Sequence, residues 1–252
     1  GVMSGTSLDG IDLAICNFTK NQYWKFKIEK ATTISYSKYW KETLHDLHLK
    51  ENKTIKKIDR EYGIFLAKNI NSFLEDEEVD FISSHGHTIF HQPDKNFTLQ
   101  IGNGQEIARL TRNKTINNFR KKDISLDGQG APLVPIGDKY LFPDNKYCLN
   151  LGGFANVSIK NNNEITAFDI CPVNIVLNQL CRNLNIDYDN KGKVARKGKL
   201  ILTLLNKLNK LSYYAQKGPK SLGKEWVEKN INHLLSFKYD TADLLHTFCE
   251  HI

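Results

Sequence analysis

The chain has 252 residues, 40% of them hydrophobic and 25% charged, which is typical of a soluble globular protein with one large or two ordinary domains. No apolar run approaches the ~20 residues of a transmembrane helix, and no signal peptide precedes the first predicted strand, so a membrane partner is not expected. The net charge of +7 comes from scattered lysines without interleaved aromatic residues, so a nucleic-acid partner is not expected either. An anionic small molecule accounts for part of this excess. Five widely spaced cysteines without Cys-x-x-Cys spacing predict reduced core thiols in a cytoplasmic protein.

The first part of the chain is predicted to mix strands and helices. The predicted strands are the opening residues, 11–18, 24–36, 79–83, 88–91, 97–101 and 115–119. The predicted helices are 38–49, 54–73, 104–112 and 132–142. The helix at 54–73 places Ile55, Ile58, Tyr62, Leu66 and Ile70 on one stripe, and the helix at 132–142 has Pro132 near its first turn. A polar segment, 120–130, separates the last strand from the last helix.

The pattern restarts after residues 143–145. Strands are predicted at 147–151, 154–159 and 164–169, followed by helices at 173–184, 199–211, 225–237 and 241–252. A strand, a glycine loop and two more strands therefore occur twice, which predicts two related α/β lobes, 1–145 and 146–252, with a cleft between them. The last helix ends on Ile252 without a polar cap, so we expect the second lobe to be cut short.

Residues 3–12 combine two glycines, three hydroxyl side chains and two aspartates. Glycines allow several backbone N–H groups to face one anion, and the carboxylates of Asp9 and Asp12 suit a hydrated cation or a sugar hydroxyl. The loop is therefore a candidate site for a nucleotide's phosphates with their magnesium. The alternative is a plain β-hairpin turn, because Asp-Gly is a common hairpin signal.

Three histidines, His85, His87 and His91, follow the strand at 79–83. A zinc site is not favoured, because no carboxylate or cysteine completes the ligand set nearby. A histidine that donates to a sugar hydroxyl and a histidine that only ends a strand both remain open.

The segment 118–133 places Arg120, Asp123, Gln129 and two glycines at the carboxyl end of a predicted strand, where α/β folds bind ligands. A carboxylate beside a basic side chain and backbone N–H groups suits a general base. The alternative is a surface loop in which Asp123 only caps a turn.

Six segments, 3–12, 84–91, 98–101, 119–133, 150–157 and 168–174, occur in the order found in the anhydro-N-acetylmuramic acid kinases. The Ser-Gly-Thr-Ser-x-Asp-Gly and Gln-Gly-Ala-Pro-Leu blocks are highly specific together, and the resemblance runs along the whole chain. It implies an α/β protein with two RNase H-like lobes of the actin/hexokinase-like ATPase fold. It also implies a cytoplasmic kinase that opens the 1,6-anhydro ring of its amino sugar and phosphorylates O6, using ATP and Mg²⁺. The product is N-acetylmuramic acid 6-phosphate, an intermediate of peptidoglycan recycling. Relatives of this kind also suggest a homodimer.

The resemblance further assigns roles to residues. Asp123 stands at the position of the base that activates water, while Arg120, Gln129 and His85 are expected to contact sugar or phosphate. No dedicated metal ligands are expected, since magnesium arrives with ATP and lies near Asp9 or Asp12. The predicted nucleotide-binding residues form one loop in each lobe: Gly5, Thr6, Ser7, Leu8, Asp9, Gly10, Ile11 and Asp12 in the first, Gly152 and Gly153 in the second.

The chain departs from the family pattern in several ways. Asp127 replaces the first glycine of Gly-Gly-Gln-Gly, Asn178 replaces an aspartate, and 170–174 read Ile-Cys-Pro-Val-Asn in place of Thr-Gly-Pro-Gly-Asn. The glycine-rich adenosine-binding motif of the family is not found. Lost glycines are expected to reshape the backbone near the nucleotide. The alternative is therefore a relative that binds sugar or nucleotide without turnover.

Overall fold

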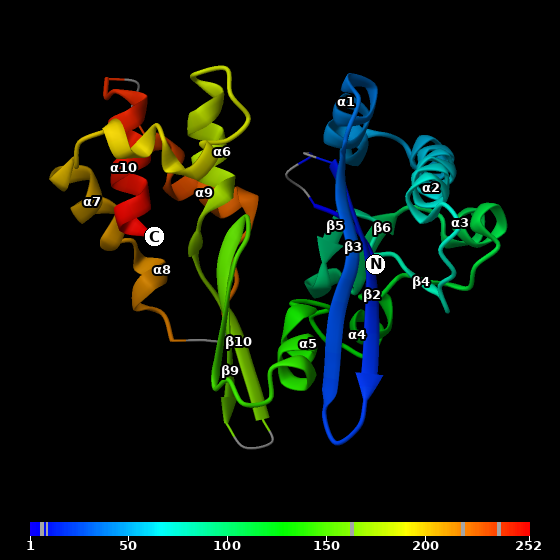
Figure 1. Cartoon of the computed structure of the whole chain (residues 1–252). Helices are drawn as coiled ribbons and strands as arrows, with labels where there is room; N and C mark the ends of the chain where they lie inside the picture. The colour runs from blue at the N-terminus through cyan, green and yellow to red at the C-terminus, as the bar shows by residue number, and fades with distance from the viewer. Residues whose placement is uncertain (6–7, 9, 162–163, 218–219, 236–237) are drawn as a thin grey trace. The chain divides into compact units, whose positions relative to one another are not determined.

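The computed structural model describes residues 1–5, 8, 10–161, 164–217, 220–235 and 238–252 (Figure 1). The predictions for Thr6, Ser7 and Asp9 lie outside these described residues. The chain is mixed α/β and divides into two compact units, Gly1–Leu133 and Val134–Ile252. The division falls before the helix that the sequence-based boundary at 145/146 assigned to the first lobe.

The first unit is built on a mixed sheet. β1 (Val2–Ser4), β2 (Gly10–Lys20) and β3 (Trp24–Ser35) form an antiparallel sheet in which β2 is central, as predicted. On the other edge of β1, Val2 forms a parallel bridge with Ser84, directly after β4 (Ile82–Ser83), and β4 pairs in parallel with β7 (Thr115–Ile116). Since β1, β4 and β7 run in the same direction, the segments that follow them meet at one edge of the sheet.

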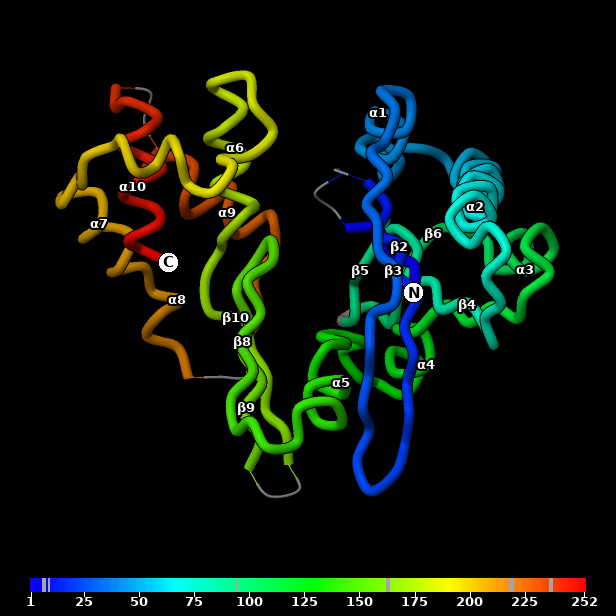
Figure 2. Tube along the Cα trace, viewed as in Figure 1, coloured from blue at the N-terminus to red at the C-terminus, as the bar shows by residue number. Residues whose placement is uncertain are grey.

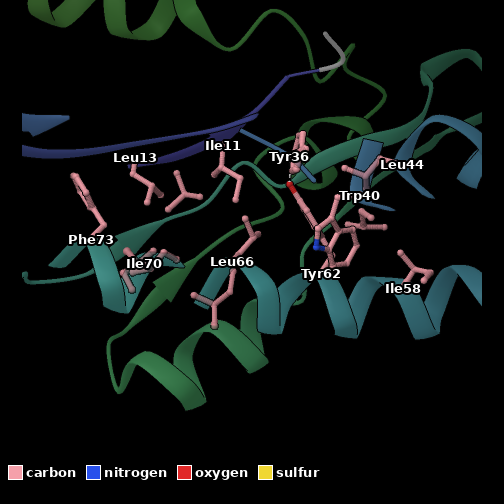
Figure 3. Packing of buried hydrophobic residues seen from close by; sticks show 14 of the residues in the cluster. Ile11, Leu13, Tyr36, Trp40, Leu44, Ile58, Tyr62, Leu66, Ile70 and Phe73 are labelled. Atoms are coloured by element: carbon pink, nitrogen blue, oxygen red, sulfur yellow. Dashed lines mark hydrogen bonds between the residues drawn. The ribbon is translucent and has the colours of Figure 1, made fainter. Parts of the chain in front are cut away.

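Helices cover this sheet and close the first core. These are α1 (Lys38–Asp46), the 3₁₀ turn η1 (Leu47–Leu49), α2 (Asn52–Leu74) and α3 (Gly104–Thr111). The predicted stripe of α2 is confirmed, because Tyr62 and Leu66 are fully buried in one cluster with Ile11 and Leu13 of β2 (Figure 3). Each buried side chain of this size contributes about 1.5–3 kcal/mol, so this packing is what holds α2 on the sheet.

A hairpin and a short helix complete the first unit. β5 (His87–Gln92) and β6 (Phe97–Ile101) are joined by the 3₁₀ turn η2 (Pro93–Lys95), as the predicted turn requires. The segment 120–130, predicted only as polar, contains the four-residue helix α4 (Lys121–Ile124).

The second unit repeats the predicted plan of three strands followed by helices. β8 (Tyr147–Leu151), β9 (Phe154–Asn161) and β10 (Glu164–Pro172) form an antiparallel sheet with β9 in the centre (Figure 2). A core of helical side chains, including Val176, Leu208, Leu245 and Phe248, is fully buried beside it. The helical elements are α5 (Val134–Leu141), α6 (Asn174–Arg182), η3 (Asn190–Gly192), η4 (Ala195–Lys197), α7 (Leu202–Asn209), α8 (Ser212–Ala215), α9 (Lys224–Asn230), η5 (Asn232–Leu234) and α10 (Thr241–His251).

Several predicted boundaries were wrong. β4 and β7 each pair over two residues only, because the chain turns into the functional segments directly afterwards. α5 begins at Val134, so Pro135 and not Pro132 lies in its first turn. α9 ends at Asn230, where asparagines favour local hydrogen bonds over a continued helix, and a 3₁₀ turn follows.

The five cysteines are free thiols, but only Cys171 and Cys181 are buried, so the prediction of a core position was wrong for the others. No helix among the described residues is long and apolar enough to span a bilayer.

Candidate functional site

The site is built where three segments leave the sheet of the first unit. Ser4 ends β1, residues 84–87 lead from β4 into β5, and residues 117–130 follow β7. Side-chain hydrogen bonds connect these segments to one another. The structure therefore brings together His85, Arg120 and Asp123, three of the residues predicted from the sequence, and adds Ser4 and His87.

A buried chain of polar groups lies below the end of β1. Ser4 Oγ is 2.6 Å from Tyr36 Oη and 3.0 Å from His87 Nδ1, and Tyr36 Oη is 2.5 Å from Tyr62 Oη. Figure 3 shows Tyr36 and Tyr62 inside the apolar cluster that α2 shares with the sheet. Burial, with a smaller contribution from His85, lowers the pKa of His87 to about 4, so this imidazole is neutral near pH 7.

His85 points to a different partner. Arg120 Nη2 donates to His85 Nε2 at 2.9 Å, so the ring proton lies on Nδ1, which donates to the carbonyl oxygen of Gly86 at 2.8 Å. Burial lowers the pKa of His85, and the positive charge of Arg120 lowers it further. A neutral imidazole thus serves as the acceptor that orients the guanidinium.

Arg120 in turn holds the loop that carries the candidate base. Its Nη1 donates to the carbonyl oxygen of Gly130 at 2.8 Å, while the N–H of Gly130 donates to Asp123 Oδ2 at 2.6 Å. Gly130 has a φ of +62°, a conformation that a glycine adopts at little cost. The exposed Asp123 carboxylate is therefore fixed at one oxygen and leaves Oδ1 for a ligand.

Only a glycine fits at residue 128 while the Asp123 carboxylate keeps its position. A Cβ at residue 128 would lie 2.3 Å from Asp123 Oδ2. The alternative in which Asp123 only caps a turn is weakened, because its carboxylate accepts from Gly130 seven residues along the chain. Gln129, predicted as a sugar contact, is exposed between these two glycines, and His91 hydrogen-bonds to its backbone.

Asp127, which stands where the family pattern has a glycine, lies in the left-handed region of backbone conformation. Its φ is +61°, a region that aspartate tolerates better than most residues, and Asn96 Nδ2 donates to its carboxylate at 3.3 Å. Asp127 thus adopts a backbone conformation that a glycine would also accept.

The described residues of the β1–β2 loop fit a nucleotide-binding role only in part. Leu8 has a φ of +58°, which is costly for a non-glycine residue and typical of functional loops. Asp12 Oδ1 accepts from Thr33 at 2.6 Å, and no described residue hydrogen-bonds to its other oxygen. The Ile11 side chain is fully buried and can offer only its backbone. Gly10 is required by packing, because a Cβ there would lie 2.4 Å from the carbonyl oxygen of Ile34.

The glycine turn of the second unit is open on its outer side. No atom of the described residues lies within 4 Å of where a Cβ of Gly153 would stand, and the nearest described atom to that of Gly152 is 3.6 Å away. The N–H of Val173 donates to the carbonyl oxygen of Gly153 at 2.9 Å, and that of Asn174 to Gly152 at 3.2 Å. The start of α6 thus holds the turn in place. Packing among the described residues does not require a glycine at position 152 or 153.

The substituted segment 170–174 is part of the core of the second unit. Cys171 and Val173 are buried against Ala155, and neither has a positive φ. Asp169, just before them, accepts from the N–H of Leu222 at 2.8 Å and so ties down the segment after residue 219. Both side chains that stand at family glycine positions are therefore packed in the core, and the expected change of the backbone near the nucleotide stays a prediction.

A cavity of about 770 Å³ lies beside α4, but Asp123 does not line it. Lys121 and Ile124 of α4 and Ser125 directly after it line the cavity, and amide side chains such as Asn117 line it from the segment after β7. The hydrogen-bonded groups, not this crevice, therefore define the candidate site. Among the described residues no group of three or more His, Cys, Asp or Glu side chains suits a metal ion.

The comparisons with known proteins identify the class. Residues 1–252 match the family described as "Anhydro-N-acetylmuramic acid kinase". The chain is similar to curated proteins of that name in Clostridioides difficile (37% identity, 96% of this chain, 69% of the relative), in Bacillus cereus (33%, 93%, 68%) and in Vibrio cholerae (32%, 99%, 71%). These relatives are kinases.

The chain belongs to the anhydro-N-acetylmuramic acid kinase family, as its sequence motifs suggested. The match does not test individual site residues, so the roles of Asp123, Arg120, His85, Gln129 and the two glycine loops stay predictions. Ser4, Tyr36 and Tyr62 were missed as site residues. Tyr62 was interpreted as a core residue because it lies in an apolar helical stripe. The residues next to Ser4 in the sequence do not indicate that its side chain bonds to Tyr36 and His87.

Proposed function

We propose that the chain transfers the γ-phosphate of ATP to O6 of anhydro-N-acetylmuramic acid while water opens the 1,6-anhydro bridge. The product is N-acetylmuramic acid 6-phosphate, and the role is recycling of peptidoglycan sugars in the cytoplasm. The observation that carries the proposal is the Asp123 carboxylate, fixed by the Gly130 N–H at 2.6 Å and linked through Arg120 to His85. The names of the relatives supply the sugar.

The chemistry needs one carboxylate. Asp123 Oδ1 takes a proton from water as the water oxygen bonds to the anomeric carbon and the bond from that carbon to O6 breaks. O6 leaves with the bonding electron pair and bonds to the γ-phosphorus, while the bond from that phosphorus to the β,γ-bridging oxygen breaks and ADP leaves with its electron pair. The phosphoryl group thus takes the place of a general acid. Oδ2 remains on Gly130, which keeps Oδ1 directed at the water. Arg120 and His85 act here by holding this loop, and Gln129 is free to reach the sugar.

Two loops are proposed to hold the triphosphate, one from each RNase H-like lobe of an actin/hexokinase-like ATPase fold. Residues Gly5–Asp12 would supply backbone N–H groups in the first lobe, and Gly152 and Gly153 in the second. The open space beside Gly153 supports this assignment, since a glycine without an internal packing reason permits close approach of a ligand. Magnesium bound to the phosphates would neutralise their charge, and Asp12 would contact its water shell through the carboxylate oxygen that Thr33 does not bind.

The test is turnover in ¹⁸O-labelled water. The chain is incubated with Mg-ATP and anhydro-N-acetylmuramic acid, and ADP and the sugar phosphate are measured by mass spectrometry. We expect one ADP per sugar phosphate and one ¹⁸O at the anomeric carbon. N-Acetylmuramic acid, which has no anhydro bridge, is the control. Absence of sugar phosphate would overturn the proposal. Calorimetric binding of sugar or ATP without turnover would instead support the non-catalytic alternative, which the buried Cys171 and Val173 at two family glycine positions favour.

A further inference from the structure

The strand that precedes the β1–β2 loop pairs with β2 along its three residues but has few backbone contacts on its other edge. β1 has three residues, and its edge toward β4 is joined by one bridge, from Val2 to Ser84, and by the N–H of His85 donating to the carbonyl oxygen of Val2 at 2.9 Å. Beyond Val2, the described residues show no backbone hydrogen bond between β1 and the segment leading into β5. At Ser4 the connection is made by side chains: Ser4 Oγ and His87 Nδ1, 3.0 Å apart.

The same two side chains are almost fully buried. Ser4 is 2% exposed and His87 3% exposed. An apolar pair at these positions would avoid the cost of desolvating a hydroxyl and an imidazole. Buried polar pairs specify one arrangement of the elements that they join. Here the joined elements are the end of β1 and the start of β5.

A continuous series of close contacts connects His87 to Asp123. Gly86 separates the two histidines with a φ of +71°, and a Cβ there would lie 2.4 Å from the carbonyl oxygen of Ile101, so this backbone is closely packed. His85 then accepts from Arg120, which holds the Gly130 loop and through it the Asp123 carboxylate. Each hydrogen bond in this path is between 2.6 and 2.9 Å.

We propose that the Ser4–His87 hydrogen bond is a positioning contact, which fixes the strand end that starts the nucleotide loop relative to the segment that carries Asp123. Neither residue touches the reacting atoms. This inference rests on the proposed kinase function. The contact would fix the position of the base relative to the loop that binds the phosphoryl donor. A positional error of about 1 Å between reacting groups costs on the order of a hundredfold in rate.

The experiment compares two variants that break the contact with two that do not. Ser4→Ala and His87→Leu remove its polar atoms. His87→Asn returns an amide atom close to the position of Nδ1. Thr111→Val removes a buried hydroxyl that donates to the carbonyl oxygen of Ile107 at 2.8 Å in α3, so it matches the chemical loss at a remote place in the same unit. The readouts are the melting temperature, the KM for Mg-ATP, the KM for the sugar, and kcat.

Ser4→Ala and His87→Leu are expected to raise the KM for Mg-ATP and lower kcat by about tenfold each, with the KM for the sugar within about twofold. His87→Asn should restore most of this loss, and Thr111→Val should lower only the melting temperature. If Ser4→Ala and Thr111→Val have the same kinetics at equal loss of stability, the contact is merely structural and the inference is wrong.

Failure of the proposed function gives a different pattern. If the parent chain neither binds Mg-ATP nor turns over sugar, the kinase proposal fails, and amide hydrogen exchange decides the positioning contact. Ser4→Ala must then speed exchange at His85 and Gly130 at least about fivefold relative to Thr111→Val. Equal exchange in the two variants would overturn the inference.

Discussion

The two units use the same strand plan for different purposes. In each, a strand, a glycine-containing connection and two further strands form an antiparallel sheet. In the first unit the opening strand β1 also has a parallel neighbour, so the segments after β1, β4 and β7 meet at one edge. In the second unit β8 pairs with β9, and the described residues place no strand on its other side.

This difference decides which unit carries reactive side chains. The shared edge of the first unit collects a carboxylate, a guanidinium and two imidazoles. The turn between β8 and β9 of the second unit has two glycines, Gly152 and Gly153, whose carbonyl groups accept hydrogen bonds from the start of α6. We therefore expect substitutions around Asp123 in the first unit to reduce turnover with little change in nucleotide affinity, and substitutions at the glycine turn of the second unit to reduce nucleotide affinity.

The largest effect is expected for Asp123→Asn. The amide oxygen still accepts from Gly130, so the loop keeps its shape, but the side chain no longer takes a proton from water. Loss of a general base lowers kcat by about 10²–10⁴-fold. Coupled ADP release measures turnover, and calorimetry should show unchanged affinity for Mg-ATP. Turnover within a few-fold of the parent would remove Asp123 from the mechanism.

A second test uses pH and stability. The pKa of His87 is about 4 in the folded chain and 6.5 ordinarily, so between these values the folded state binds fewer protons than the unfolded state. Its stabilising contribution is present above pH 6.5 and is lost as the pH falls toward 4, by about 3 kcal/mol in total. Denaturant titrations from pH 7 to 4 measure this loss.

The variant His87→Asn should make the stability of the first unit less dependent on pH over this range. His251, whose pKa burial also lowers to about 4, is the counterpart in the second unit, and its pH dependence should persist in His87→Asn. An unchanged slope in this variant would show that His87 is protonated in the folded chain.

Gly128→Ala tests the fit around the candidate base. The added methyl group would lie 2.3 Å from Asp123 Oδ2, so the carboxylate must move away from the Gly130 N–H. We expect kcat to fall by about 10–100-fold with little change in the KM for Mg-ATP. Asp127→Gly, one residue earlier, relieves a φ of +61° and should leave kcat unchanged. Equal kinetics for the two variants would argue against a fixed carboxylate.

The sequence predicted the parts of the fold that depend on local pattern. The buried stripe of α2 follows from its helical spacing, and the two strand plans follow from alternation and glycine turns. The strands β4 and β7 were predicted to be longer than they are, because pairing between parallel strands depends on partners distant in the chain. α4 was missed because four residues, of which only Ile124 is apolar, are too few to show a helical period.

The site was predicted less completely than the fold. Asp123, Arg120 and His85 were found from residue type and family motif, and the structure joins them. The chain from Ser4 through Tyr36 to Tyr62 links residues 32 and 26 positions apart. Such pairings depend on the folded packing of β1, β3 and α2, so no local pattern could show them.

The smallest expected effect separates two glycines of the second unit. Gly153 and Gly137 both have open space where a Cβ would stand, so alanine fits at either position. Gly137→Ala lies inside α5 and should stabilise the chain by about 0.5–1 kcal/mol without changing kinetics. Gly153→Ala should leave stability unchanged but raise the KM for Mg-ATP about tenfold, because its methyl group fills the space assigned to a phosphate. If both variants have the parent's affinity for Mg-ATP, the turn at Gly152 and Gly153 does not hold the triphosphate, and the first unit binds it alone.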